Sequence, residues 1–375
     1  MTLDLPATPQ TPAIDTSLPP FVLVDGSYYL FRTFHGLPPL TTSKGLYTNA
    51  IKGTLNSLQK LMRRYQPTHM AVVFDTAEPT FRHELSVDYK AHRPKMPDEL
   101  SEQIPYIHAL IRALGIPLLT LPGAEADDLI GTLAARACRE GHHVLISTGD
   151  KDMAQLVHGH ILLEDSFKDQ LMDHRGVIEK FGVRPDQIRD YLTLMGDASD
   201  GIAGIPKIGA KTASKLLQQY DTIGGILENI DQIKGAVGQS LRDNADQIPL
   251  NHQLASIVCD LPLELDWHEL KLGESRIEEL RRLYTELEFK GLLQSLDHPN
   301  HPDQLARQNS SVTAPSQTLP LPASVLATAQ PTATEANAHL TVASRYHTVQ
   351  DNASLIALID RLQSAERFAI DTETT

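Results

Sequence analysis

The chain has 375 residues, 41% of them hydrophobic and 21% charged, which is enough apolar sequence for one large core or two modest ones and excludes wholesale disorder. Asp and Glu outnumber Lys and Arg by 47 to 33, and the formal charge of -14 argues against a protein that coats nucleic acid by bulk attraction. No apolar run approaches the roughly 18 residues of a membrane helix, no leader pattern opens the chain, and two cysteines cannot build a disulfide framework, so we expect a cytosolic protein without a membrane partner.

Strands and helices alternate in the first half of the chain, after a loose Thr-, Pro- and Ala-rich extension over residues 1–19. Strands are predicted at Phe21–Val24, Ala71–Phe74, Ile116–Leu121, Val144–Ile146 and Ile161–Leu163. Amphipathic helices are predicted at Ala50–Tyr65, Asp98–Leu114 and Ala124–Glu140. This alternation predicts an α/β fold over residues 20–182, with a mostly parallel central sheet and flanking helices.

Helices dominate after residue 182. The patterns at Pro185–Met195, Lys211–Gln219 and Glu274–Leu287 predict a helical subdomain over residues 183–300. Residues 301–344 are rich in Ala, Pro, Ser and Thr, which is typical of a flexible linker. Residues 345–375 resume a strand and helix pattern that is too short to form a domain by itself.

Acidic residues recur where the predicted strands end. Asp25 and Asp75 close the first two strands, and the remaining acids are Glu125, Asp127 and Asp128 after the third, Asp150 and Asp152 after the fourth, and Asp197 and Asp200 in a later turn. Because the carboxyl ends of parallel strands share one edge of the sheet, we expect these groups to meet there. A single Asp after a strand is usually a helix cap or a turn residue, but five such groups are hard to explain in that way.

Nine carboxylates in one concavity require cations, because like charges a few ångströms apart do not all stay ionised. Oxygen ligands without Cys or His favour Mg²⁺ or Mn²⁺ over Zn²⁺. Two such metals would activate a water and stabilise the leaving oxygen in phosphodiester hydrolysis.

Two basic segments have the residues needed to bind the phosphates of such a substrate. Residues 81–97 carry Arg82, Lys90, Arg93 and Lys95 with Tyr89 between them, which suits a phosphate clamp with a base-stacking face; the alternative is a solvated loop.

The second basic segment, residues 204–215, is not a nucleotide phosphate loop, because Ala210 separates Gly209 from Lys211. We interpret it as a helix-turn-helix hairpin that grips duplex phosphates without reading base sequence, and the alternative is an ordinary Gly-Pro turn that caps a helix. The candidate DNA contacts in it are Gly204, Ile205, Lys207, Gly209, Lys211, Thr212 and Lys215.

Six motifs and the hairpin together form a pattern that is specific enough to identify a family. The motifs are Val24-Asp25-Gly26-Ser27, Val72-Val73-Phe74-Asp75, Tyr89-Lys90-Ala91-His92-Arg93-Pro94, Glu125-Ala126-Asp127-Asp128, Thr148-Gly149-Asp150-Lys151-Asp152 and Gly196-Asp197-Ala198-Ser199-Asp200. Residues 21–296 resemble the 5' nuclease domains of bacterial DNA polymerases I, in the flap endonuclease superfamily. The segment from Tyr346 resembles the start of a 3'-5' exonuclease domain, with Asp371 and Glu373 as its first acidic motif.

The resemblance implies a role for each matched residue. Asp25, Asp75, Glu125, Asp127 and Asp128 would hold a first metal, and Asp150, Asp152, Asp197 and Asp200 a second. Lys90 and Arg93 would stabilise charge on the scissile phosphate from a helical arch, with Arg32 as a further basic residue and Tyr89 stacked on a displaced base. The hairpin corresponds to a helix-three-turn-helix motif that binds DNA and K⁺. One departure is Gly201-Ile202-Ala203, where the family often has Asn-Ile-Pro, and it bears on loop rigidity rather than on the acids.

We therefore expect a monomeric, metal-dependent 5'-3' exonuclease and flap endonuclease that acts on DNA and RNA primers at nicks and 5' flaps in replication and repair, with polymerase and 3'-5' exonuclease domains if the full chain continues. One alternative is a non-catalytic module that binds DNA junctions. Another is a phosphatase that uses Asp25 as nucleophile, which would need a second acid where Ser27 stands.

Overall fold

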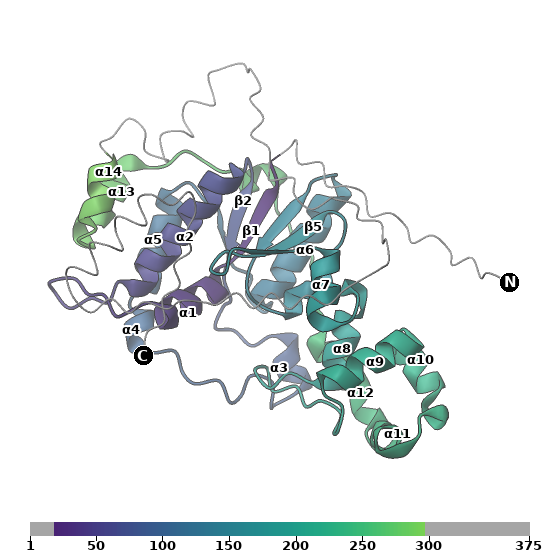
Figure 1. Ribbon diagram of the computed structural model, residues 1–375. Helices are drawn as coiled ribbons and strands as arrows, with labels where there is room; N and C mark the ends of the chain where they lie inside the picture. The colour runs from purple at the N-terminus through teal and green to yellow at the C-terminus, as the bar shows by residue number, and fades with distance from the viewer. Residues whose placement is uncertain (1–18, 297–375) are drawn as a thin grey trace, which may run out of the picture. The chain divides into compact units, whose positions relative to one another are not determined.

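A six-stranded sheet lies at the centre of the computed structural model, which describes residues 19–296 (Figure 1). Its strands are β1 Phe21–Asp25, β2 Met70–Val73, β3 Leu118–Leu119, β4 Val144–Ser147, β5 Ile161–Asp165 and β6 Gln170–Met172, in the order β3-β2-β1-β4-β5-β6. All neighbouring pairs are parallel except β5 and β6. The five predicted strands are confirmed, although β3 is only two residues long, and β6 was not predicted because it is short and largely exposed.

Helices cover both faces of the sheet. The elements of this layer are α1 Gly26–Gly36, α2 Asn49–Tyr65, α4 Asp98–Ser101, α5 Ile104–Ala113, α6 Ala126–Arg139, the 3₁₀ turn η1 Asp152–Leu156 and α7 His174–Phe181. The alternation along β1 explains the two layers: Val22 and Val24 pack with α1, α2 and α5, whereas Phe21 and Leu23 pack with α6. The predicted helix over 98–114 is interrupted between α4 and α5, where Pro105 occupies the first turn of α5.

The second half of the described chain is helical, as predicted. Its elements are η2 Pro185–Gln187, α8 Ile188–Met195, α9 Ala210–Tyr220, α10 Ile223–Glu228, η3 Ile230–Gln232, α11 Gly235–Asp243, η4 Ala245–Gln247, α12 Ile248–Ala255, η5 Trp267–Leu270, α13 Ile277–Glu286 and α14 Lys290–Leu296. The packing differs from the predicted boundary at one point: Leu280, Leu283 and Leu296 join the core of α2 and α5. Residues 277–296 are therefore part of the sheet's outer layer (Figure 1).

The arch segment, residues 86–97, is not the predicted helix. The short helix α3 Phe81–Leu85 precedes it, and a chain of turns follows as far as α4. Lys90 has a φ of 53°, and Pro94 removes a backbone donor and disfavours helical backbone at Arg93. These features break the helical pattern, so the side chains of this segment are placed by turns and by contacts with other elements.

The predicted extension covers residues 1–19, and all of it except residue 19 lies outside the described residues. The predicted linker over 301–344 and the segment 345–375 lie outside them as well.

Candidate active site

Eight of the nine predicted acids line the carboxyl edge of the sheet. β1 lies between β2 and β4, so Asp25 is flanked by the acids that follow those strands, Asp75 and Asp150. Asp127, in the first turn of α6, is close enough to all three for their charges to raise its pKa. We call Asp25, Asp75, Asp127 and Asp150 the first acidic group.

Burial and repulsion between carboxylates disfavour ionisation of Asp25, Asp127 and Asp150. Burial is the main cause that raises the pKa of Asp25 to about 7, and the charges of Asp75 and Asp150 add to it. The pKa of Asp127 is raised well above its usual range, chiefly by burial and then by Asp150. A cation bound among these carboxylates would remove both the repulsion and the cost of burial.

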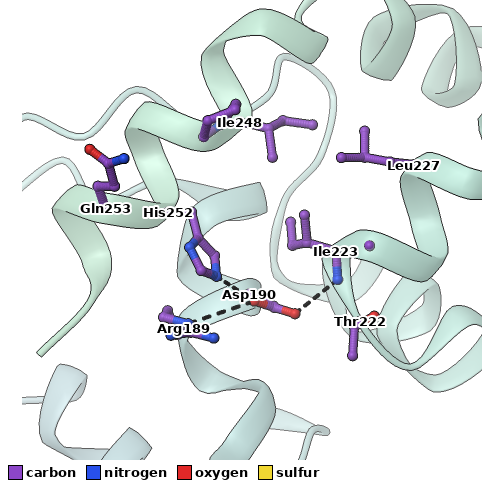
Figure 2. Close-up of a pocket in the computed structure, with 10 residues that line it drawn as sticks. Arg189, Asp190, Thr222, Ile223, Leu227, Ile248, His252 and Gln253 are labelled. Carbon is purple, nitrogen blue, oxygen red and sulfur yellow. Dashed lines mark hydrogen bonds and ion pairs between the residues drawn. The ribbon is translucent and has the colours of Figure 1, made fainter.

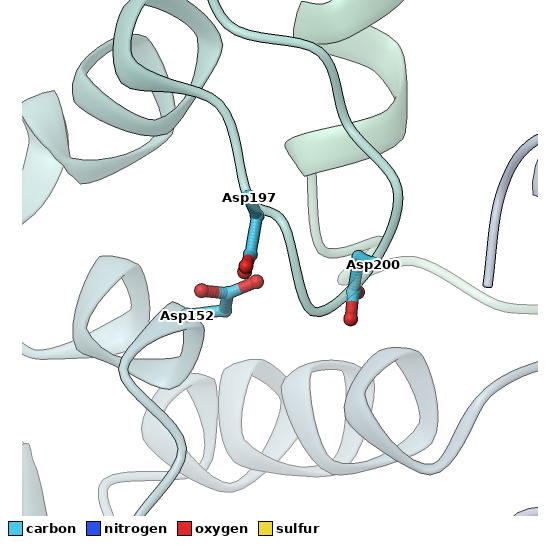
Figure 3. A group of neighbouring side chains, drawn as sticks. All are labelled: Asp152, Asp197 and Asp200. Carbon is cyan, nitrogen blue, oxygen red and sulfur yellow. The ribbon is translucent and has the colours of Figure 1, made fainter. Parts of the chain in front are cut away.

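A second acidic group consists of Asp152, Asp197 and Asp200 (Figure 3). One carboxylate oxygen from each of them lies within 4.8 Å of the other two. Asp152 opens η1, and the other two lie in the loop that follows α8. Burial raises the pKa of Asp152 to about 8, with Asp150 as the strongest charged contributor. The buried Oδ1 of Asp152 finds no hydrogen-bond partner among residues 19–296. Such an orphaned oxygen within a set of hard carboxylate donors fits a divalent cation such as Mg²⁺ or Mn²⁺.

Glu125 and Asp200 connect the acids to the arch segment. The Lys90 ammonium lies 3.0 Å from Glu125 Oε2, and an Arg93 amino group lies 2.6 Å from Asp200 Oδ1. The Lys90 amide also donates to the Asp200 carbonyl, and Arg93 Nε donates to the Ser199 carbonyl. The two predicted phosphate ligands therefore face the acids directly.

Tyr89 does not offer a stacking surface. Its hydroxyl donates to Glu125 Oε2 at 3.0 Å and to Asp200 Oδ2 at 3.2 Å, and the residue is 2% exposed. The predicted contact with a displaced base is wrong for this structure, because the ring is enclosed by the core and by His83. Its role here is to bridge two carboxylates from different elements.

The predicted roles of Asp128 as a metal ligand and of Arg82 as a DNA contact are also wrong. Two Arg82 nitrogens donate to the two Asp128 oxygens, each at 2.7 Å, and the Val258 amide donates to Asp128 Oδ1 at 2.9 Å. Asp128 is 0% exposed and Arg82 is 2% exposed. Because consecutive helical residues point about 100° apart, Asp127 faces the site while Asp128 faces the interface with α3 and residues 254–258. Neither residue of the pair is available to a metal or to DNA.

Two residues at the site were not predicted from the sequence. Thr148 donates its hydroxyl to Asp25 Oδ2 at 2.8 Å, while Asp25 Oδ1 accepts the Tyr28 amide and caps α1. Lys151 lies 3.0 Å from Asp197 Oδ1. The only sequence signal for Lys151 was its position between Asp150 and Asp152.

The hairpin presents three exposed ammonium groups, on Lys207, Lys211 and Lys215, which we call the hairpin lysines. Gly204 is required by packing, because a Cβ there would lie 2.1 Å from the Met195 carbonyl oxygen. Gly209 precedes α9, and Thr212 lies half-buried in its first turn. Ile205 is a further correction: its side chain is buried and its amide donates to the Leu194 carbonyl, so it has nothing to offer a phosphate.

Arg32 and Lys95 are exposed basic residues. The Arg32 guanidinium lies over the Phe167 ring, 5.8 Å from its centroid, on the exposed side of α1. Lys95 lies in the arch segment after Pro94. Both are accessible to a polyanion, but neither contacts the acids.

Two cavities are lined by residues of the helical half. One of about 790 Å³ adjoins the second acidic group and is lined by His92, Lys151, Asp197 and the loop as far as Gly204. The other, of about 420 Å³, lies between α8, α10 and α12 (Figure 2). In it, Asp190 accepts the Ile223 amide at 2.8 Å and pairs with His252 at 3.2 Å, which ties these helices together. Among the described residues, no helix is both long and apolar enough to span a membrane.

Comparison with known proteins gives consistent matches. The family model for the N-terminal resolvase-like domain of 5'-3' exonuclease matches residues 20–182, and that for the C-terminal SAM fold of 5'-3' exonuclease matches residues 183–278. The 5'-3' exonuclease of Aquifex aeolicus is 40% identical over 275 residues, which is 73% of this chain and 94% of the relative. The DNA polymerase I of Pseudomonas aeruginosa is 45% identical over 367 residues, and the match covers 95% of this chain but only 37% of the polymerase.

Solved structures support the same fold. The zinc-bound T5 5'-exonuclease has a TM-score of 0.53 at 22% identity, covering 72% of this chain and 98% of the other. A complex of the T5 flap endonuclease with DNA and metal ions has a TM-score of 0.53 at 20% identity, covering 74% and 98%. The two family models and the nearly complete match to the Aquifex enzyme establish that this chain belongs to the 5'-3' exonuclease family.

Proposed function

We propose that this chain is the N-terminal nuclease region of a DNA polymerase I, a divalent-metal-dependent, structure-specific 5' nuclease. It hydrolyses phosphodiesters of DNA and of RNA primers at nicks and 5' flaps during replication and repair. The observation that carries the proposal is the pair of acidic groups, poorly neutralised and partly buried, with Lys90 and Arg93 facing them. Family membership and the polymerase I relatives support the same conclusion.

The two acidic groups provide the metal ligands in this proposal. Asp25, Asp75, Asp127 and Asp150 hold one cation, and Asp152, Asp197 and Asp200 hold the other, with Glu125 at their border. Mg²⁺ is the cation that such oxygen donors favour, and Mn²⁺ can replace it. When bound, two divalent cations supply an activated water and charge stabilisation for the leaving oxygen.

Lys90 and Arg93 stabilise the reacting phosphate. Both are held by carboxylates, at 3.0 Å from Glu125 and 2.6 Å from Asp200, and both have the flexible stems that allow a transfer to phosphate oxygens. Because negative charge on the phosphate grows in the transition state, their effect falls on turnover more than on binding. We expect Lys90→Ala to lower kcat by at least about a hundredfold, with a much smaller change in the affinity for a flap duplex.

DNA is held away from the reacting bond by groups that do not read sequence. The hairpin lysines are exposed on one hairpin and suit the phosphates of the duplex, and the hairpin is our candidate K⁺ site. Arg32 and Lys95 are placed to contact further phosphates. We further propose that the region works as a monomer in the cytosol, next to the polymerase and 3'-5' exonuclease domains of its full-length chain.

Cleavage of a 5'-labelled flap duplex tests the assignment. We expect products that end at the junction in Mg²⁺ and none in EDTA or in Ca²⁺. Asp197→Asn should abolish cleavage, whereas Asp186→Asn, which neutralises a surface carboxylate paired with Arg184, should cleave like the wild type. Tight junction binding without cleavage in Mg²⁺ or Mn²⁺ would instead establish the alternative of a non-catalytic binding module.

A further inference from the structure

Lys151 is placed as a positive charge within the second acidic group. It follows Asp150 and precedes Asp152 in the chain, and its ammonium lies 3.0 Å from Asp197 Oδ1. The carboxylate it contacts is 4% exposed, whereas the lysine side chain is 37% exposed. Because Asp197 is buried, this contact is screened less by water than an ordinary surface ion pair.

The hydrogen bonds of Asp197 fix one end of its carboxylate. Oδ1 accepts the Ser199 amide at 2.9 Å and the Ser199 hydroxyl at 2.5 Å, in addition to the ammonium of Lys151. These contacts hold the carboxylate in one orientation, and one of its oxygens lies within 4.8 Å of an oxygen of Asp152 and of an oxygen of Asp200 (Figure 3).

The charge of Lys151 reaches beyond Asp197. Lys151 lies between Asp150 and Asp152 in the chain, and so its charge also offsets part of the repulsion among the carboxylates around it. Asp152 itself has an orphaned Oδ1 among the described residues, so the lysine compensates its charge only from a distance. Lys151 thus neutralises part of the negative charge that a bound cation would otherwise neutralise.

We propose that Lys151 is a positioning residue that orients Asp197 and weakens the binding of a divalent cation to the second acidic group. The inference rests on the proposed function, in which this group holds a metal. A divalent cation bound to the Asp197 carboxylate would lie close to an ammonium of like charge on the same carboxylate, and the Coulomb repulsion between the two lowers the affinity for the cation. The first acidic group has no such lysine bound to its carboxylates within the described residues, so it fills at a lower concentration of cation.

The lysine side chain also has space in which to move away from Asp197. Its side chain lines the cavity of about 790 Å³ beside Asp197, and its flexible stem gives the ammonium a path into that space. The repulsion therefore lowers the affinity of the second group without closing it to the cation.

Titration with Mn²⁺ in the absence of DNA tests this inference by a readout other than activity. Mn²⁺ binding is followed by electron paramagnetic resonance and calorimetry in the wild type and in Lys151→Met, which keeps the apolar stem and loses the charge. We expect the weaker class of Mn²⁺ sites to tighten by at least about tenfold in Lys151→Met. Lys151→Arg, which keeps the charge, should bind like the wild type.

Two controls keep the result interpretable. Lys168→Met removes a lysine from a surface pair with Asp165 and should leave Mn²⁺ binding unchanged. Lys151→Gln provides a second neutral variant if Lys151→Met folds poorly, as judged by thermal unfolding in EDTA. If the wild type binds Mn²⁺ and neither neutral variant binds it more tightly, the role of Lys151 is overturned while the metal assignment stands. Failure of every variant, and of the wild type, to bind Mn²⁺ would overturn the metal assignment as well.

Discussion

The buried ion pair between Arg82 and Asp128 allows a direct test of whether Asp128 is structural or a metal ligand. Asp128→Asn removes the negative charge but nearly preserves the shape of the side chain. One asparagine oxygen can still accept a bond from Arg82, but its amino group then faces a second guanidinium N–H, so two donors oppose each other. Arg82 would keep only the more distant Glu125, at 3.4 Å, as an acidic neighbour.

The loss can be estimated from the burial of the pair. Breaking a buried ion pair by changing one partner typically costs about 3 to 5 kcal/mol, and both side chains here are at least 97% buried. For the roughly 280 described residues, an unfolding entropy of about 2.1 cal/mol/K per residue gives about 0.6 kcal/mol/K. Asp128→Asn should therefore lower Tm by about 5 to 9 °C.

Thermal unfolding in EDTA, followed by circular dichroism, measures this loss without any contribution from metal. Titration of the folded variant with Mn²⁺ should give the same affinities as the wild type. The double variant Arg82→Met with Asp128→Leu should recover much of the stability, because apolar residues can replace a buried pair. An unchanged Tm together with a loss of Mn²⁺ affinity would refute the structural role and restore Asp128 as a ligand.

Stability of the metal-free protein should fall as pH rises from about 5 to 8, because the native pKa of Asp152 is about 8 whereas its ordinary value is 3.8, so the native state holds a proton that the unfolded chain has lost. Asp152 alone contributes up to about 1.4 kcal/mol per pH unit to the slope measured in EDTA. Asp152→Asn should therefore reduce the slope, while Asp25, whose pKa is raised to about 7, keeps part of it; a stability that increases over this range would contradict the assignment. Gly201→Ala should speed hydrogen exchange in the arch segment, because the added Cβ would lie 2.3 Å from the Asp88 carbonyl oxygen. Gly36→Ala, where the added Cβ meets open space, serves as the control. Equal exchange rates in the two variants would show that the arch segment does not depend on this contact. Replacing all three hairpin lysines by Ala should reduce the log–log salt slope of duplex binding by about three, and an unchanged slope would exclude them as phosphate contacts.

The fold and the position of the acids could be predicted from local sequence. Short apolar runs identify the strands, alternation with helices requires a parallel sheet, and a parallel sheet brings the residues after its strands to one edge. Asp25, Asp75 and Asp150 follow from this argument alone, because it needs only the ends of the strands. The two-residue β3 and the antiparallel β6 show its limit, since very short strands carry little periodicity.

The partner of each charged residue was decided by tertiary structure. Asp127 and Asp128 are neighbours in sequence and look equivalent, yet a rotation of about 100° along α6 points one to the site and the other to Arg82. Tyr89 and Arg82 look like surface residues of a basic loop, but contacts with Glu125 and with residues 254–258 bury them. Local sequence determined which residues could carry the chemistry, and only the packing of distant segments decided which carboxylates were neutralised from within and which were left for a cation.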